Sequence, residues 1–250
     1  GTFDGKDNYN GFNVDASAGA VVNITGGEFL PVHSGSLYGE GTINVTGGEF
    51  FDDPSERVAE GYFATQEDSK YVVYKAVAAI GETMYKSIED AIAAVGTSST
   101  ITVLCDAEMA SDAKIAAGKT VVIDLNGCTI STVDNTEKNY QIIQNNGNLT
   151  IKNSAENTAK MTVKATINSG WNRYSAVIAN TVGGNLTVEG NVVLEHLGGT
   201  DMAYGIDNLT NGKGTYAVTT INGATVKSPY RAVRQFLNGV EATNELYVKA

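Results

Sequence analysis

The sequence predicts an all-β protein, a right-handed parallel β-helix (a solenoid of stacked coils) with one short amphipathic helix. Three observations lead to this prediction: the composition, a strand motif that recurs along the chain, and the presence of a single convincing helical segment. The 250 residues include 28 glycines and only 3 prolines. Such a composition suits many short strands joined by tight turns, because glycine adopts positive φ at little cost.

The first third of the chain repeats one strand motif. "VNITGGEF" ends at Phe29, "INVTGGEF" ends at Phe50, and a looser copy, "GTF", ends at Phe3. Apolar and polar residues alternate in each copy, which predicts a half-buried strand. We interpret the glycine pair as the bend at which the chain leaves the strand.

A second series, with longer repeats, occupies the last third. Its tyrosine-led segments start at Tyr140, Tyr174, Tyr204 and Tyr230, at intervals that shorten along the chain. Each is followed by another strand motif, such as "NLTI" at 148–151, so we expect two strands in each repeat. Units of this size bury their apolar face only by stacking, at about 4.8 Å per coil. A propeller blade needs roughly 40–50 residues, and a sandwich would not repeat its motif in register. A solenoid is therefore favoured.

The segment "SIEDAIAAVG", 87–96, predicts the amphipathic helix. Ser87 can cap it, with Asp90 completing a capping box, and Gly96 is expected as the residue that ends it. One face is apolar, formed by Ile88, Ala91, Ile92 and Val95. We expect this helix to cover the open end of a solenoid, where backbone groups would otherwise be unpaired.

A domain boundary is expected near residue 75. The segment 52–77 interrupts the repeats, is richer in charge and can form a hairpin around "EDSK". We therefore interpret 1–75 as the C-terminal coils and closing cap of one β-helix module. Residues 76–250 are then the N-terminal cap helix and coils of a second module.

Several stretches resemble the repeated β-helix modules of large cell-surface proteins from Gram-positive gut bacteria. They are "AAIGETMYKSIEDAIAAV", "ITVLCD", "IAAGKTVVIDLNGCTIS", "NVTGGEFFDDPSERVAEGY" and "YRAVRQFLN". The resemblance covers most of the chain and implies a pectin-lyase-like fold. It also implies an extracellular or cell-surface location, with any wall anchor in regions outside this sequence.

The resemblance implies an adhesive or structural role. The wider pectin-lyase-like superfamily includes polysaccharide lyases and glycoside hydrolases, but their catalytic Asp, Arg and Lys positions cannot be matched here. We therefore expect a non-catalytic module that acts in adhesion, in glycan binding or as a rigid stalk, and we assign no catalytic residue. The alternative is a polysaccharide lyase or glycoside hydrolase domain.

Charge and cysteine usage exclude several classes of partner and cofactor. The net charge is −11 and no Lys/Arg cluster occurs, so nucleic acid is not an expected partner. No apolar run reaches the roughly 18 residues of a membrane span, so membrane insertion is not expected. Cys105 and Cys128 lack metal-ligand spacing, and two buried apolar side chains are favoured over a disulfide. No cofactor or metal site is predicted.

The best candidate for ligand binding is "NSGWNRYSA" at 168–176. Trp171, Arg173 and Tyr174 are predicted to bind carbohydrate, because aromatic rings stack on sugars and Arg binds hydroxyl groups. The ligand would be a host or environmental glycan or a surface protein. Asp106, Asp124 and Asp207 are carboxylates near strands, and we expect them to face solvent or bind turn backbone.

The two ends of the chain also match the repeat. Joined, they read "LYVKAGTFDG", similar to the internal "INVTGGEFFDD". This similarity suggests a tandem array and an unpaired sheet edge at the end of the second module. We therefore expect end-to-end self-association, head to tail.

Overall fold

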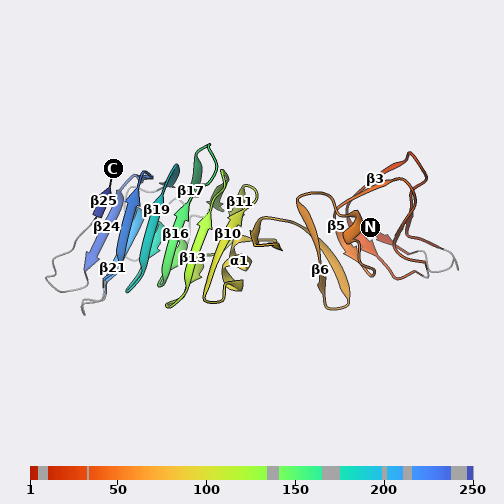
Figure 1. The fold of residues 1–250 in the computed structure, drawn as a ribbon, viewed down its shortest axis with the longest axis horizontal. Helices are drawn as coiled ribbons and strands as arrows, with labels where there is room; N and C mark the ends of the chain where they lie inside the picture. Colours follow the sequence, from red (N-terminus) through yellow and green to blue (C-terminus); the bar gives the residue numbers. More distant parts are fainter. Residues whose placement is uncertain are drawn as a thin grey trace. The chain divides into compact units, whose positions relative to one another are not determined.

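The computed structural model describes residues 1–4, 11–32, 34–133, 141–164, 175–198, 202–210, 216–237 and 247–249. The chain forms two compact units, Gly1–Ala76 and Val77–Ala250. In the described residues the fold consists of strands in mostly parallel sheets, one α-helix and one 3₁₀ turn, Ser55–Arg57 (Figure 1). The predicted all-β character is therefore confirmed.

The first unit is built on one mixed five-stranded sheet. Its first three strands are parallel, and the last two are antiparallel to their neighbours. In spatial order the strands are β1 (Thr2–Phe3), β3 (Val21–Phe29), β5 (Thr42–Phe50), β7 (Lys70–Lys75) and β6 (Tyr62–Glu67). A second, two-stranded parallel sheet pairs β2 (Val14–Asp15) with β4 (Leu37–Tyr38).

The three copies of the strand motif lie side by side in register. Phe3 pairs with Phe29, which pairs with Phe50. Their rings are stacked, with centroids 4.6 Å and 4.4 Å apart. Phe29 and Phe50 are both buried in the core of the unit. The repeat seen in the sequence is thus a stack of identical side chains on neighbouring strands.

The glycine pairs do not end their strands, which corrects the sequence-based interpretation. β3 and β5 continue through them to the phenylalanine, with the register shifts of a β-bulge. Gly48 adopts φ +121°, and a Cβ there would lie 3.1 Å from the Phe50 ring and 3.2 Å from the Gly27 carbonyl oxygen. The conformation and the close approach both require glycine.

The predicted hairpin around "EDSK" is confirmed. β6 and β7 pair antiparallel, and Asp68 in the turn between them has φ +54°. β7 also pairs with β5, so the hairpin covers the edge of that strand. Lys70 donates hydrogen bonds to Glu28 and Glu49, which are neighbours on β3 and β5.

The predicted helix is present as α1 (Ile88–Ala94). Ser87 Oγ accepts a hydrogen bond of 3.0 Å from the Asp90 N–H, and the apolar face is buried as expected. The helix ends at Ala94 with Val95 as its extended C-cap, so Gly96 follows as the C′ residue, as the sequence predicts, although Gly96 does not adopt positive φ. Lys119 Nζ donates a hydrogen bond of 2.5 Å to the Val95 carbonyl oxygen and so gives this group, at the end of the helix, a partner. Among the described residues, no helix is long and apolar enough to span a membrane.

The second unit contains three sheets, named here after their first parallel strand. The β10 sheet comprises β9 (Thr83–Tyr85), β8 (Ala78–Ile80), β10 (Ser98–Val103), β13 (Thr120–Asp124), β16 (Asn148–Lys152), β19 (Asn185–Glu189), β22 (Val218–Asn222) and β25 (Tyr247–Lys249). The β11 sheet comprises β11 (Ala107–Met109), β14 (Thr129–Thr132), β17 (Ala159–Val163), β20 (Val192–His196) and β23 (Thr225–Lys227). The β12 sheet comprises β12 (Ala113–Ile115), β15 (Gln141–Asn145), β18 (Ser175–Asn180), β21 (Ala203–Thr210) and β24 (Arg231–Leu237).

The chain visits these three sheets in rotation. β10, β11 and β12 make one turn, and β13, β14 and β15 pair in parallel with them as the next turn. The tyrosine-led and "NLTI"-type motifs form strands of the β12 and β10 sheets. Each turn therefore has three strands, whereas the sequence predicted two, and the β11 sheet is the one that was missed.

The core of the second unit is formed by columns of identical or similar side chains. One column in the β10 sheet runs from Ile101 through Ile123 and Ile151 to Val188 and Ile221. All five are buried. α1 packs on the first strands of this core through Ile88 and Ile92. Burial of these columns is the main favourable contribution to folding.

A polar column lies inside the same core. Asn145, Asn180 and Asn208 occupy equivalent positions on β15, β18 and β21, and all three are fully buried. Asn145 Nδ2 donates to Asn180 Oδ1 at 2.9 Å, and Asn180 Nδ2 donates to Asn208 Oδ1 at 3.0 Å. This asparagine ladder ties three successive turns together through side chains.

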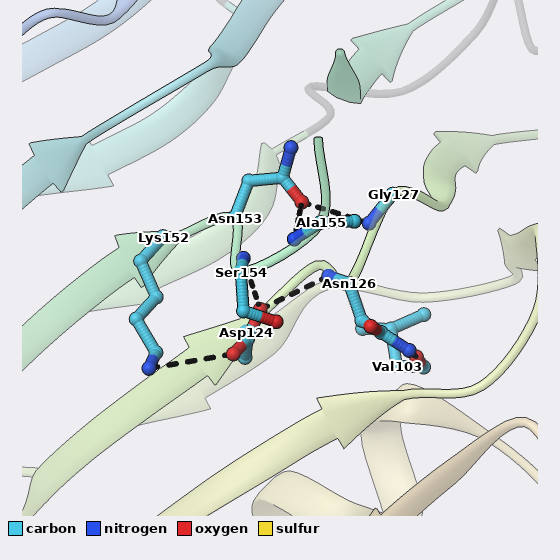
Figure 2. Close-up of polar contacts among 8 residues, drawn as sticks. All are labelled: Val103, Asp124, Asn126, Gly127, Lys152, Asn153, Ser154 and Ala155. Atoms are coloured by element: carbon cyan, nitrogen blue, oxygen red, sulfur yellow. Dashed lines mark hydrogen bonds and ion pairs between the residues drawn. The ribbon is translucent and has the colours of Figure 1, made fainter. Parts of the chain in front are cut away.

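Hydrogen-bonded corners connect the β10 sheet to the β11 sheet. Asp124 Oδ1 accepts from the N–H groups of Asn126 and Ser154, at 3.0 Å each, and its Oδ2 lies 3.3 Å from Lys152 Nζ (Figure 2). Asn153 Oδ1 likewise accepts from the Gly127 N–H at 2.8 Å. Burial alone would raise the pKa of Asp124, but these bonds outweigh it and the pKa is lowered. These bonds fix the corners that precede β14 and β17.

Candidate functional site

A shallow groove runs over the outer face of the β11 sheet. Two strands of this sheet, β11 and β17, are labelled in Figure 1. Its volume is about 570 Å³. Charged groups of both signs, hydroxyl groups and two apolar side chains line it. The lining residues are Asp106, Ala107, Glu108, Thr129, Ser131, Lys160, Thr162, Lys164, Glu195 and Leu197.

Strand alternation and register bring these side chains to one face. Glu108, Ser131, Thr162 and Glu195 are register partners on β11, β14, β17 and β20. Their sequence neighbours Met109, Ile130 and Met161 point inward and are fully buried. Adjacent strands are about 4.8 Å apart, so the row from Glu108 to Glu195 extends roughly 14 Å.

The floor of the groove is polar and its walls are charged. Ser131 and Thr162 are only 8% and 7% exposed, because longer side chains on the neighbouring strands flank them. Lys164 Nζ lies 2.6 Å from Glu108 Oε1, across the strand that separates β11 from β17. Both partners remain well exposed to solvent, and such ion pairs contribute little to stability. A ligand can therefore displace this pair with little loss of stability.

The groove combines three carboxylates, Asp106, Glu108 and Glu195, with the ammonium groups of Lys160 and Lys164. Asp106 Oδ1 accepts a 2.7 Å hydrogen bond from the Thr129 N–H, which holds this carboxylate at the start of the row. Leu197 is 57% exposed and adds an apolar surface beside the charged groups. Donors, acceptors and an apolar contact thus line one elongated depression.

The expectations for the three aspartates are met in part. Asp106 is exposed to solvent and Asp124 binds turn backbone, as the sequence predicted. Asp207 instead is fully buried and pairs with Arg234, whose Nε lies 2.6 Å from Asp207 Oδ1. The Arg234 guanidinium also stacks over the ring of Tyr204, 4.1 Å from its centroid. This cluster is buried and joins β21 to β24, so it is not an accessible site.

The predicted carbohydrate-binding residues Trp171, Arg173 and Tyr174 lie outside the described residues. The structure therefore neither places them near the groove nor separates them from it, and their role stays a prediction. Most of the groove was missed in the sequence because its members come from strands that are far apart along the chain. Asp106 was singled out, but no motif links it to Lys164 or Glu195.

His196 is a buried titratable side chain of the second unit. It is 2% exposed, and its Nδ1 accepts a hydrogen bond from the Gly198 N–H at 3.2 Å. Its Nε2 is buried without a hydrogen-bond partner. Burial lowers the pKa of His196 to about 4, so the ring is neutral at physiological pH. It lies at the inner side of β20, behind the groove.

A metal site is not found within the described ranges, where no group of three His, Cys, Asp or Glu side chains could hold an ion. No protein-family model, curated protein or solved structure matches this chain. Its function must therefore be inferred from the groove and from the architecture that carries it.

Proposed function

We propose that this chain is part of a secreted or surface-anchored bacterial protein, built from right-handed parallel β-helix modules of pectin-lyase-like type, and that it binds glycan. In the second unit, consecutive strands belong to three mostly parallel sheets in turn, and columns of buried apolar side chains run along these sheets. Both features support the β-helix. Right-handedness is the hand that parallel crossover connections almost always adopt. In this proposal α1 caps the second module, and residues 1–75 are the last coils and closing cap of the preceding one.

The observation that carries the glycan-binding proposal is the groove on the β11 sheet. Sugar hydroxyls both donate and accept hydrogen bonds, so they match a surface with carboxylates, hydroxyls and ammonium groups. Leu197 provides an apolar contact for the C–H face of a ring. The row of about 14 Å suits a short oligosaccharide better than a single sugar. Adhesion to a glycan-bearing surface is the role that follows.

Titration calorimetry with a panel of neutral and acidic oligosaccharides tests the proposal. Wild-type protein should bind at least one class, and Thr162→Val, in the groove floor, should weaken that binding by roughly tenfold. Thr187→Val is the matched control, because Thr187 occupies a strand of the β10 sheet away from the groove. Absence of binding across the panel, or equal loss in both variants, would contradict a groove-based glycan site.

A second candidate function, cleavage of a polysaccharide, is favoured by one specific observation. Asp106 and Glu108 lie two residues apart, and both carboxylates line the same groove. Glycosidases use a pair of carboxyl groups that flank the bond they cleave. However, Glu108 is paired with Lys164 and Asp106 with the Thr129 N–H. We therefore propose glycan binding, and not polysaccharide cleavage, as the first function of the groove.

Release of reducing ends or unsaturated sugars from the same panel distinguishes the two functions. Turnover that Glu108→Gln abolishes, with binding retained, would establish cleavage and replace the non-catalytic proposal. Binding without turnover in the wild type supports an adhesive module.

A further inference from the structure

The two cysteines of the chain lie on adjacent turns of the second unit. Cys105 precedes β11 and Cys128 precedes β14. The parallel register pairs Ala107 with Ile130, and two residues back along each strand this alignment places Cys105 opposite Cys128. The hydrogen bond from the Thr129 N–H to Asp106 Oδ1, at 2.7 Å, joins the intervening residues and supports the alignment.

Each cysteine lies just before its strand. Cys105 is two residues before β11 and Cys128 is one residue before β14. Cys128 packs against the core of the unit, and its Sγ lies 3.8 Å from the carbonyl oxygen of Val103, two residues before Cys105. Both cysteines are half-buried, so a small oxidant can reach them.

The spacing suits a disulfide. Neighbouring strands hold paired Cα atoms about 4.8 Å apart, within the roughly 4.4–6.8 Å that disulfides span. Burial is the main cause that raises the pKa of the Cys128 thiol, and the charges of Asp106 and Cys105 raise it further. The contribution of Cys105 agrees with two thiols that lie close together.

We propose that Cys105 and Cys128 form an inter-turn disulfide in an oxidising environment. The oxidant is a small-molecule disulfide such as oxidised glutathione. One cysteine thiolate attacks it, giving a mixed disulfide and releasing one glutathione thiolate. The second cysteine thiolate then attacks the protein sulfur and displaces the other glutathione. The two thiol protons and two electrons of the protein end on two reduced glutathione molecules.

The crosslink joins the first two turns next to Asp106, where the groove begins. In the unfolded chain it closes the loop that runs from Cys105 to Cys128. Restricting the unfolded state in this way stabilises the fold. The crosslink is independent of glycan binding, and its test involves no ligand.

The test is to equilibrate the full, folded chain with oxidised glutathione and measure its intact mass with and without prior reduction. We expect the loss of two hydrogen atoms, resistance to alkylation until a reductant is added, and a monomeric crosslinked species. The oxidised protein should melt roughly 5–10 °C above the reduced protein. Cys105→Ser and Cys128→Ser are matched controls, and each should instead retain one glutathione or one alkylatable thiol.

Three results would overturn the proposal. One is full alkylation of both thiols in the wild type after equilibration with oxidised glutathione. Another is a wild-type protein that carries two separate glutathione adducts. The third is a crosslink found only between chains. Because the primary readout is the mass of the wild type, it does not require the serine variants to fold.

Discussion

The buried asparagine ladder allows a quantitative test of how successive turns are joined. Asn180 is at its centre and is fully buried. Its Oδ1 accepts from Asn145, and its Nδ2 donates to Asn208 Oδ1 and to the Val218 carbonyl oxygen, the latter at 2.8 Å. Replacing Asn180 by Ala removes these bonds, together with the one from its Nδ2 to Thr219 Oγ1 at 3.1 Å, and leaves the buried Asn145 amide without this partner.

The expected loss can be worked out from the partners. Asn145 Nδ2 keeps its bond to the Asn185 carbonyl oxygen but loses its bond to Asn180 Oδ1, so one buried N–H becomes unpaired. Asn208 Oδ1 still accepts from Thr219 Oγ1 and is only partly affected. Each buried group left unpaired costs about 1–3 kcal/mol. The Val218 carbonyl oxygen is only partly buried, so the unpaired Asn145 N–H is the main loss, and Asn180→Ala should lower the free energy of unfolding by about 1–3 kcal/mol.

Asn185→Ala is the matched control. Asn185 Nδ2 donates to Asn148 Oδ1 at 2.9 Å, a bond of the same kind on the exposed side of β16 and β19. Water replaces that bond when it is lost, so the change should stay below about 1 kcal/mol. Equilibrium unfolding in urea measures both. Equal destabilisation by the two substitutions would refute the reasoning, since it would mean that burial adds nothing to the ladder.

Three further predictions concern other parts of the chain. Because burial lowers the pKa of His196 to about 4 from an ordinary value near 6.5, the unfolded chain binds a proton that the folded chain does not. Stability should therefore fall by about 3 kcal/mol from pH 6.5 to pH 4, and His196→Asn should remove this part of the pH dependence in urea titrations. Ile92→Asp forces a charge into the core under α1 and should destabilise the second unit by several kcal/mol; an unchanged melting temperature would contradict the capping role of the helix. End-to-end association should appear as a scattering mass that rises with concentration, and a constant monomer mass would count against it.

Local signals in the sequence predicted the elements that depend on few neighbours. The helix at 88–94 was predicted from the Ser87 cap and one apolar face, and the β6–β7 hairpin from a charged turn between two strands. The repeated phenylalanines predicted stacked strands, because one side chain at one position of each repeat is what in-register pairing requires. The glycine pairs of the repeated motif did not distinguish two local structures, because glycine occurs both in bends that end a strand and in β-bulges within one. The structure has the β-bulge.

The sequence by itself determined an all-β chain with stacked repeats and one helix, because strand alternation and capping are local properties of residues a few positions apart. Only the tertiary structure showed the third strand of each turn and the groove on the β11 sheet. The interval between register partners changes from turn to turn: the step from Ile151 to Val188 is much longer than the step from Ile101 to Ile123. Without a fixed period, no pattern aligns Glu108 with the distant Lys164, or Cys105 with Cys128. Those contacts exist because backbone hydrogen bonding between turns sets the register, and register is a property of paired strands rather than of one segment.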